Sequence, residues 1–508
     1  MEPFYFEALM SIKTAIAKFL AKRTRKKLTA EALNGVELQL QCMQNLISTA
    51  RDTDFGKDHG FGTIQGHEDF AKQIPIRDYE ALKAYVDRVV DGDQDVLWPG
   101  QPIYFAKTSG TTSGAKFIPI TKDSISNHIN SARNMLLCYV HQKGNADFLN
   151  GKLIFLQGSP ELKKQKGVHL GRLSGIVAHH VPGYLQRNRL PSMETNCIDD
   201  WEQKLDAVID ETLDEDMTLI SGIPPWVQMY FDRLTEKTGK KVGELFPNFN
   251  LMVHGGVNFA PYKSKLIESI GREVDILETY PASEGFIAFQ DNYEEEGLLL
   301  NVNSGIFFEF IPVADYHNEK PRRLHLGQVE VGENYAVIIN SNAGLWGYSI
   351  GDTVKFISKA PYKLVVTGRI KHFISAFGEH VIAQEVADSL ANTALRYQST
   401  VLEFTVAPQV NPEEGLPYHE WFIEFDQPPT NMSAFAKDLD TALCQKNSYY
   451  DDLISGSILR PLIIREMQPK GFQEYMKSKG KLGGQNKVPK LSNNREMADD
   501  LSPWLKPG

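Results

Sequence analysis

The chain has 508 residues, of which 42% are hydrophobic and 23% are charged. This length and composition predict roughly two to four globular domains with well-filled cores, and they argue against a disordered chain. The formal net charge of −10 disfavours a general nucleic-acid binder, because such proteins usually carry a basic domain. The acidic balance still allows an anionic substrate, which needs only a few cations placed locally.

The N-terminal segment is partly apolar over positions 10–20, but Lys13 and Lys18 interrupt it, so no secretory signal peptide is predicted. The basic run Lys22–Lys27 follows. We expect an amphipathic helix that packs on the protein body, and a helix on a membrane surface is the alternative. No stretch of 18 apolar residues occurs, so no membrane span is predicted.

Cysteines and histidines give no pattern of a metal or disulfide site. The four cysteines lie far apart and form no Cys-x-x-Cys pair, which predicts reduced and mostly buried thiols in a cytoplasmic protein. The histidines at 169, 179, 180 and 254 have no spacing that compels a metal, so we expect them to be structural.

Through the first 370 residues, short runs rich in branched side chains alternate with helical patterns. The strand candidates are residues 152–156, 217–221, 251–254, 274–277 and 335–339. Apolar residues at 201, 205, 208, 209 and 213 recur at helical spacing, after a cap at Asp199 or Asp200. This alternation predicts an α/β fold with substantial sheet.

The sequence predicts a division into a large domain over residues 1–368 and a small domain over residues 369–508. The small domain has helical patterns at 384–397 and 433–446 and strand patterns at 402–406 and 421–425, which is an α+β composition. Its segment 477–494 is polar and rich in Gly, Lys and Asn, so composition alone predicts a flexible tail there.

The strongest chemical signal is the run Thr108-Ser109-Gly110-Thr111-Thr112-Ser113-Gly114-Ala115-Lys116. Glycines allow successive backbone N–H groups to turn inward and bind an anion, and hydroxyls and the lysine add donors and charge. The spacing differs from the common P-loop. A polar surface loop is the alternative, but so dense a run of donors favours a phosphate site.

Four short motifs follow in chain order, and each alone would be read as a turn. They are Gly255-Gly256-Val257, Thr279-Tyr280-Pro281-Ala282-Ser283-Glu284-Gly285, Tyr348-Ser349-Ile350-Gly351-Asp352 and Gly368-Arg369-Ile370-Lys371. Together with the hydroxyl-rich loop, they resemble the signature motifs of the adenylate-forming superfamily, which includes acyl-CoA ligases, luciferases and peptide-synthetase adenylation domains. The resemblance implies a large luciferase-like domain that binds ATP and the acyl substrate, and a small C-terminal domain that rotates about Arg369–Lys371.

The end of the chain narrows the family. Residues 480–490 read Gly-Lys-Leu-Gly-Gly-Gln-Asn-Lys-Val-Pro-Lys, which is similar to the Asn-Gln-Tyr-Lys-x-Pro-Arg ending of the auxin-responsive Gretchen Hagen family of acyl acid–amido synthetases. Residues 117–119 and 344–352 match that family too. Gly347, Ser349 and Ala282 depart from the plant pattern, which usually has arginines at the first two positions and a serine at the third. The chain therefore resembles a distant member outside the plant branch.

The resemblance implies ATP and Mg²⁺ as cofactors, with AMP as a product. Lys487 would bridge the acyl carboxylate and the α-phosphate, and Glu284 would hold the metal. Tyr280 would flank adenine, and Asp352 would hold the ribose. The wider nucleotide site would comprise Thr108, Ser109, Gly110, Thr111, Thr112, Lys116, Gly255, Gly256, Thr279, Ser283 and Arg369.

The implied reaction adenylates a carboxylic acid and transfers the acyl group to an amine, with an amino acid as the favoured acceptor. An acyl-CoA ligase, which shares the adenylation step but uses a thiol acceptor, is the alternative. A catalytically silent nucleotide-binding protein is a third possibility. The expected partners are small-molecule acids and amines, and no nucleic acid is expected.

Overall fold

The computed structural model describes residues 3–111, 114–181, 183–198, 200–370, 373–374, 379, 381–455, 458–483, 486–492 and 494–507. The chain forms two compact units. Unit 1 comprises Met1–Ile223, Glu236–Gly256 and Glu273–Val365, and unit 2 comprises Pro224–Thr235, Val257–Arg272 and Val366–Gly508. Two segments from the first 368 residues thus pack with the C-terminal part, and the functional division at 368/369 remains a prediction. Among the helices that the structure describes, none is long and apolar enough to cross a membrane.

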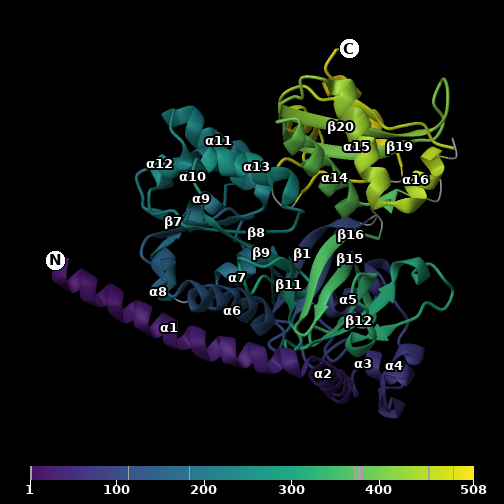
Figure 1. The fold of residues 1–508 in the computed structure, drawn as a ribbon. Coiled ribbons are helices and arrows are strands. Elements are labelled where there is room, and N and C mark those ends of the chain that lie inside the picture. The colour runs from purple at the N-terminus through teal and green to yellow at the C-terminus, as the bar shows by residue number, and fades with distance from the viewer. Residues whose placement is uncertain are drawn as a thin grey trace. The chain divides into compact units, whose positions relative to one another are not determined.

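A mixed sheet of twelve strands forms the centre of unit 1 (Figure 1). The strand order is β13-β12-β14-β15-β16-β11-β10-β9-β8-β7-β3-β6. The bounds are β3 Lys152–Phe155, β6 Arg189–Leu190, β7 Met217–Gly222, β8 Leu251–Gly255, β9 Asp275–Ala282, β10 Gly285–Phe289, β11 Leu298–Leu300, β12 Ile306–Pro312, β13 Leu324–His325, β14 Asn334–Ser341, β15 Tyr348–Lys359 and β16 Tyr362–Arg369. Strands β6, β3, β7, β8 and β9 pair in parallel. The pairs β9–β10, β10–β11, β11–β16, β15–β14, β14–β12 and β12–β13 are antiparallel.

The strands and the helix expected from the first 368 residues are confirmed, with shifts of one to a few residues at their ends. Strands β7 and β8 are largely buried because helices cover both faces of a parallel sheet, so their sequences are continuous apolar runs. Helix α10 (Trp201–Thr212) begins after Asp200, whose side chain accepts the N–H of Gln203. Asp199, the other cap candidate, lies outside the described residues.

A separate four-stranded sheet of unit 1 has the order β2-β1-β5-β4. Its strands are β1 Tyr104–Thr111, β2 Gly114–Ile120, β4 Lys163–Gln165 and β5 Val168–Gly171. Strands β1 and β2 pair antiparallel, and the described residues of the hydroxyl-rich run belong to these two strands. This sheet therefore carries the predicted phosphate loop.

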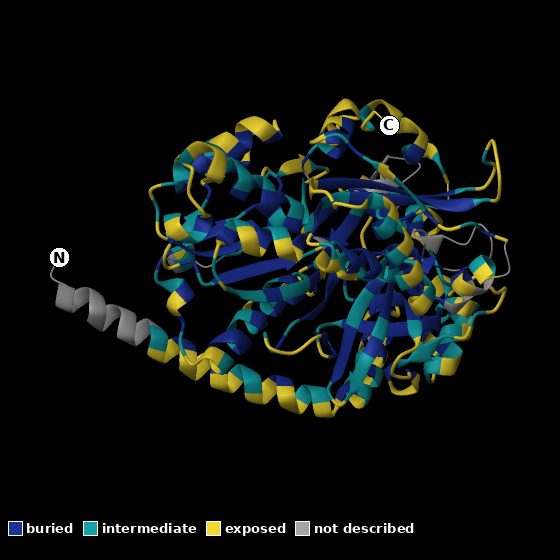
Figure 2. Cartoon of the chain, turned by 45° about the horizontal axis from the view of Figure 1, so that its top comes forward, coloured by how far each residue is buried: buried dark blue, intermediate teal, exposed yellow. Residues whose placement is uncertain are grey.

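Helices surround the sheets of unit 1, and their buried and exposed faces alternate (Figure 2). They are α1 Pro3–Leu33, α2 Gly35–Ala50, α3 Asp54–Asp58, α4 His67–Gln73, α5 Tyr79–Asp91, α6 Ile125–Lys143, α7 Leu173–Ala178, α8 Gly183–Gln186, α9 Met193–Asn196, α10 and α12 Val242–Leu245. Ala17, Ala21 and Leu28 of α1 are buried in one core with Met135 and Cys138 of α6. Over its described side chains, α1 packs on the protein body as predicted.

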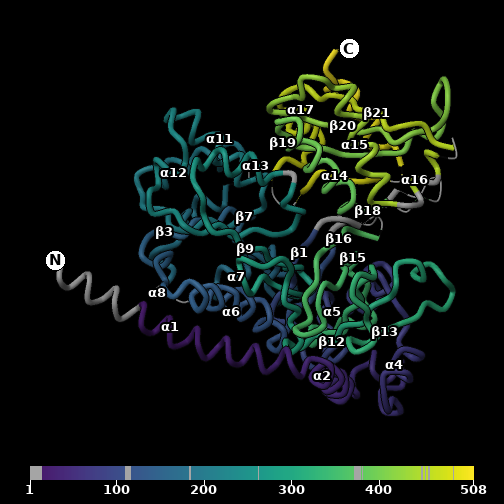
Figure 3. The backbone as a smooth tube through the Cα atoms, viewed as in Figure 1, coloured from purple at the N-terminus to yellow at the C-terminus, as the bar shows by residue number. Residues whose placement is uncertain are grey.

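Unit 2 contains the three-stranded sheet β19-β20-β21 and the two-stranded ribbon β17-β18 (Figure 3). Its elements are α11 Pro224–Thr238, which begins in the unit, α13 Ala260–Ile270, β17 Phe373–Ile374, β18 Val381–Ile382, α14 Ala383–Arg396, β19 Thr400–Gln409, β20 Tyr418–Gln427, α15 Met432–Lys446, α16 Ser448–Ser455, β21 Ile463–Glu466, α17 Gly471–Ser478 and α18 Glu496–Asp500. Its core joins Phe404, Trp421 and Leu439, so the predicted α+β composition is confirmed.

The polar segment near the end of the chain packs on β19 over its described residues, and it is not a free tail. The N–H of Val406 donates to the carbonyl of Lys490 (3.0 Å), and the N–H of Ser492 donates to the carbonyl of Val406 (3.0 Å). The Lys490 ammonium donates to Glu403 and, over 2.5 Å, to the Tyr262 hydroxyl of α13. These contacts fix the chain three residues beyond Lys487.

Candidate active site

The described parts of the hydroxyl-rich run belong to strands β1 and β2, in which Thr108 pairs with Lys116. Tyr79, at the start of α5, holds the second strand, because its hydroxyl accepts the N–H of Phe117 (2.9 Å). The Lys116 Nζ lies 5.7 Å from the centroid of the Tyr79 ring. Gly110 belongs to β1, whereas Thr112 and the side chains of Ser109 and Thr111 lie outside the described residues.

The Gly-Gly motif ends β8, and its glycines have a structural reason. A Cβ on Gly255 would lie only 2.5 Å from the carbonyl oxygen of Thr279, so no larger residue fits beside β9. Gly256 has a φ of +83°, which favours glycine. The Thr279 hydroxyl donates to the carbonyl of His254 (2.8 Å), so its side chain ties β9 to β8.

Glu284 and Ser283 form the two-residue turn between β9 and β10, in which Gly285 pairs with Ala282. The Glu284 carboxylate accepts a hydrogen bond from the Tyr348 hydroxyl (3.3 Å). Burial and the neighbouring Glu284 charge raise the pKa of Tyr348 well above its usual value, so Tyr348 stays a neutral donor. The tight turn therefore presents one oriented carboxylate.

Asp352 lies on β15 and contacts Tyr280 of β9. The Tyr280 hydroxyl donates to Asp352 Oδ2 (2.9 Å), and only 7% of Tyr280 is exposed. Tertiary structure thus joins Tyr280 with Asp352 and Glu284 with Tyr348, although about 70 residues separate the partners in sequence. Tyr348 belongs to one of the sequence motifs but was not among the predicted site residues. The sequence signal that could have identified Tyr348 is its position four residues before Asp352, the candidate for ribose binding.

The start of β15 is held by a buried network that no local sequence pattern predicts. The Asn340 side chain accepts the N–H of Gly347 (2.6 Å) and donates to Glu309 (3.0 Å). Gly347 has a φ of +56°, and a Cβ there would lie 2.4 Å from the carbonyl oxygen of Pro75. The local backbone therefore leaves no room for a side chain at Gly347.

Lys487 and Arg369, the remaining predicted site residues, belong to unit 2. Arg369 is exposed at the end of β16, and Lys487 is exposed in the segment that Lys490 anchors. Lys371 lies outside the described residues. The roles of Lys487 and Arg369 remain proposals.

A single carboxylate at a turn suits a magnesium ion that arrives with a nucleotide. Such an ion keeps several waters and takes one or two protein carboxylates plus phosphate oxygens. Glu284 offers that donor type. Among the described residues, no group of three or more His, Cys, Asp or Glu side chains is placed to hold a metal ion. Burial lowers the pKa of His254 to about 3, so this histidine is neutral.

Solved structures show the class of fold. The chain superposes on the GH3.15 acyl acid amido synthetase in complex with 2,4-DB with a TM-score of 0.78 at 16% identity, covering 96% of both chains. It also superposes on 2-hydroxyisobutyryl-CoA ligase with a TM-score of 0.59 at 11% identity, covering 92% of this chain and 90% of that one. The fold is that of the adenylate-forming ligases.

Sequence comparison gives the family. Models of the GH3 family N-terminal, central and C-terminal domains match residues 24–192, 299–369 and 383–496. This protein belongs to the GH3 family. It is 22% identical to indole-3-acetic acid-amido synthetase GH3.15 of Arabidopsis thaliana over 91% of both chains. It is also 22% identical to jasmonoyl-L-amino acid synthetase JAR4 of Nicotiana attenuata, over 63% of this chain and 66% of that protein.

Proposed function

We propose that this protein is an acyl acid–amido synthetase that uses ATP and Mg²⁺ to adenylate a carboxylic acid and then transfers the acyl group to an amino acid. The observation that carries the proposal is a pair of hydrogen bonds in a GH3 family member, Tyr280–Asp352 and Tyr348–Glu284, which join the β9–β10 hairpin to β15. Four cysteines without a disulfide support a reducing compartment, and we propose the cytoplasm.

A free carboxylate is a poor electrophile, so amide formation needs activation. Attack of the carboxylate oxygen on the α-phosphorus forms a mixed anhydride and breaks the bond to pyrophosphate, which leaves with the electron pair. Charge then develops on the phosphorus oxygens and must meet fixed positive groups. In this proposal Lys116 and the hairpin cradle the phosphates, Glu284 holds the Mg²⁺ of the nucleotide, and Lys487 approaches after domain rotation.

The test separates amide synthesis from its closest rival. Purified protein is incubated with ATP, Mg²⁺ and a panel of acids, with either coenzyme A or a mixture of amino acids, and the products are identified by mass spectrometry. Acyl-amino acids are expected. Acyl-CoA as the dominant product would favour a ligase with a thiol acceptor. Nucleotide binding without acid-dependent pyrophosphate release would favour a silent protein.

Replacing Asp352 with alanine is expected to raise the KM for ATP about 10- to 100-fold, because hydrogen bonds to a charged group contribute about 1.5–3 kcal/mol. Tyr280→Phe should give a smaller increase, since it removes only the hydroxyl that orients Asp352. Steady-state rates of pyrophosphate release, measured against ATP concentration, give the KM of both variants. Asp214→Ala, at an exposed turn, is the control. An unchanged KM in Asp352→Ala would remove Asp352 from the nucleotide site.

A further inference from the structure

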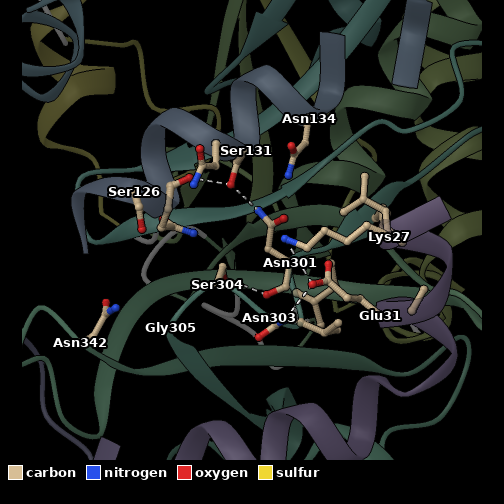
Figure 4. Close-up of a pocket in the computed structure, with 17 residues that line it drawn as sticks. Lys27, Glu31, Ser126, Ser131, Asn134, Asn301, Asn303, Ser304, Gly305 and Asn342 are labelled. Carbon is tan, nitrogen blue, oxygen red and sulfur yellow. Dashed lines mark hydrogen bonds and ion pairs between the residues drawn. The ribbon is translucent and has the colours of Figure 1, made fainter. Parts of the chain in front are cut away.

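Unit 1 contains a cavity of about 260 Å³ between α1, α6 and the connection from β11 to β12 (Figure 4). Binding sites for small molecules span about 300–1,000 Å³, so this cavity suits a small ligand. A second cavity, beside Trp201 and Leu205, measures about 10 Å³ and holds at most one water. The larger cavity is the candidate for a substrate site.

The cavity lies directly behind the strand that follows Glu284. Asn127 lines it and holds Phe286 of β10 by two bonds. The Asn127 side chain donates to the carbonyl of Phe286 (3.2 Å) and accepts the N–H of the same residue (2.6 Å). A Cβ on Gly285 would lie 3.6 Å from Asn127 Oδ1. The cavity therefore borders the backbone of β10 within two residues of Glu284.

The wall that α6 contributes is polar, although it faces the protein. Asn127, Asn130, Ser131 and Asn134 follow the i, i+3, i+4, i+7 spacing of one helix face, which in a helix packed on a core is normally apolar. The opposite wall adds Asn301, Asn303 and Ser304. Figure 4 shows the Asn134 amide pointing toward the space that Lys27 and Asn301 border.

The side-chain amides of Asn130 and Asn134 are available to a ligand. Asn127 is committed to Phe286, and the Ser131 hydroxyl donates to the Asn127 carbonyl (2.7 Å) and accepts from Asn301 (3.0 Å). Asn130 and Asn134 are half-buried, and no partner for either amide occurs among the residues that the structure describes. Each amide offers a donor and an acceptor.

Helix α1 closes the cavity with a carboxylate. Glu31 accepts from Asn303 (2.7 Å), lies 3.6 Å from the Lys27 ammonium, and its side chain is 16% exposed. An ionised carboxylate only accepts hydrogen bonds. Because the Lys27 ammonium lies beside it and lines the same cavity, the pair carries no net charge, and Glu31 offers an acceptor to a neutral hydroxyl group on a ligand.

We propose that this cavity receives the tail of the acyl acid, and that the acid is a small monocarboxylate carrying hydroxyl or other neutral hydrogen-bonding groups. The proposal rests on the proposed function, since it identifies the substrate class of the same enzyme. An apolar tail would leave the amides of Asn130 and Asn134 unpaired. A site built to form hydrogen bonds rejects a substrate analogue that lacks the matching polar groups.

The test compares acids that match in carbon skeleton, such as gluconate with hexanoate and dihydroxyphenylacetate with phenylacetate. The wild-type enzyme is expected to prefer the hydroxylated member of a pair by about 10- to 100-fold in kcat/KM. Replacing both Asn130 and Asn134 with leucine should reduce or reverse this preference, and Asn134→Leu alone should reduce it in part. Arg133→Leu, on the exposed side of the same helix, should leave it unchanged.

Saturation-transfer NMR measures the binding of each acid in the absence of ATP. This measurement separates the cavity proposal from the proposed function. If no acid releases pyrophosphate but hydroxylated acids bind the wild type and not the double variant, the cavity assignment stands and the proposed reaction fails. If apolar acids react as well as their partners and the leucine variants do not change the ratio, the substrate class is wrong and the reaction stands. Binding of no hydroxylated acid would also overturn the assignment.

Discussion

Replacing Lys487 with alanine is expected to lower acid-dependent pyrophosphate release about 10²- to 10³-fold, as the loss of one charge-stabilising donor commonly does. Negative charge grows on the α-phosphate oxygens during adenylation, and a lysine held there stabilises the transition state more than bound ATP. Lys487 is exposed and its neighbour Lys490 anchors the segment, so the thermal midpoint should not change. Initial rates of pyrophosphate release measure the effect.

The control for this prediction comes from the same segment. Lys481 is also exposed, and Lys481→Ala should keep nearly the wild-type rate. Lys487→Ala supplied with preformed acyl-adenylate should still make the amide, because the proposed role is confined to the first half-reaction. Equal loss in both half-reactions, or an unchanged adenylation rate, would contradict the role of Lys487.

Replacing Arg323 with methionine is expected to destabilise unit 1 by about 3–5 kcal/mol, the usual cost of leaving one partner of a buried ion pair alone. Arg323 binds Glu309 by two hydrogen bonds (3.0 and 2.5 Å), and their side chains are 6% and 0% exposed. The same guanidinium donates to the carbonyls of Ala71 and Ile74. Urea unfolding followed by circular dichroism measures the change.

The adjacent Arg322 provides a matched control for Arg323. Its side chain is 70% exposed and pairs with Asp315 at the surface, so Arg322→Met should change the unfolding midpoint little. A double variant, Glu309→Leu with Arg323→Met, should recover part of the lost stability because no buried charge remains. If Arg323→Met unfolds at the same urea concentration as Arg322→Met, the buried pair is not a major source of stability.

The same pair predicts a loss of stability in acid. Burial by itself would raise the pKa of Glu309, but the charge of Arg323 and the hydrogen bonds from His67 and Arg323 lower it from 4.5 to about 2. Because the folded-state pKa is depressed, this contribution is present above about pH 4.5 and is lost as pH falls toward 2. The lowered pKa corresponds to about 3 kcal/mol of folding free energy. The difference in unfolding free energy between wild type and Glu309→Gln should shrink as the pH falls from about 4.5 toward 2. A difference that stays constant would refute this role of Glu309.

Effects of the buried pair should extend to the active site. Glu309 accepts from Asn340, Asn340 holds the backbone of Gly347, and the next residue is Tyr348, which donates to Glu284. Each link is a hydrogen bond with a fixed geometry. The chain of contacts gives a physical reason for the buried Glu309 carboxylate, since it helps to hold the strand that carries Tyr348 and Asp352, two residues of the proposed nucleotide site.

Sequence by itself determined the class of protein and the order of its parts. Strands β7 and β8 could be predicted because buried parallel strands need continuous apolar runs, and α10 could be predicted from its periodicity and the cap at Asp200. The hydroxyl-rich run and the motifs around Glu284 and Asp352 indicated a nucleotide site because they combine unusual residue types over short spans.

Only the tertiary structure decided which side chains meet. Tyr280 contacts Asp352 across 72 positions, and Arg25 contacts Asp291 across 266, and no local pattern encodes such pairings. The polar face of α6 is ambiguous in sequence, because asparagines at helical spacing usually indicate a solvated surface. It becomes a candidate substrate site only when α1 and the β11–β12 connection enclose it. Long-range packing creates that enclosure, and a pattern read along one segment cannot contain it.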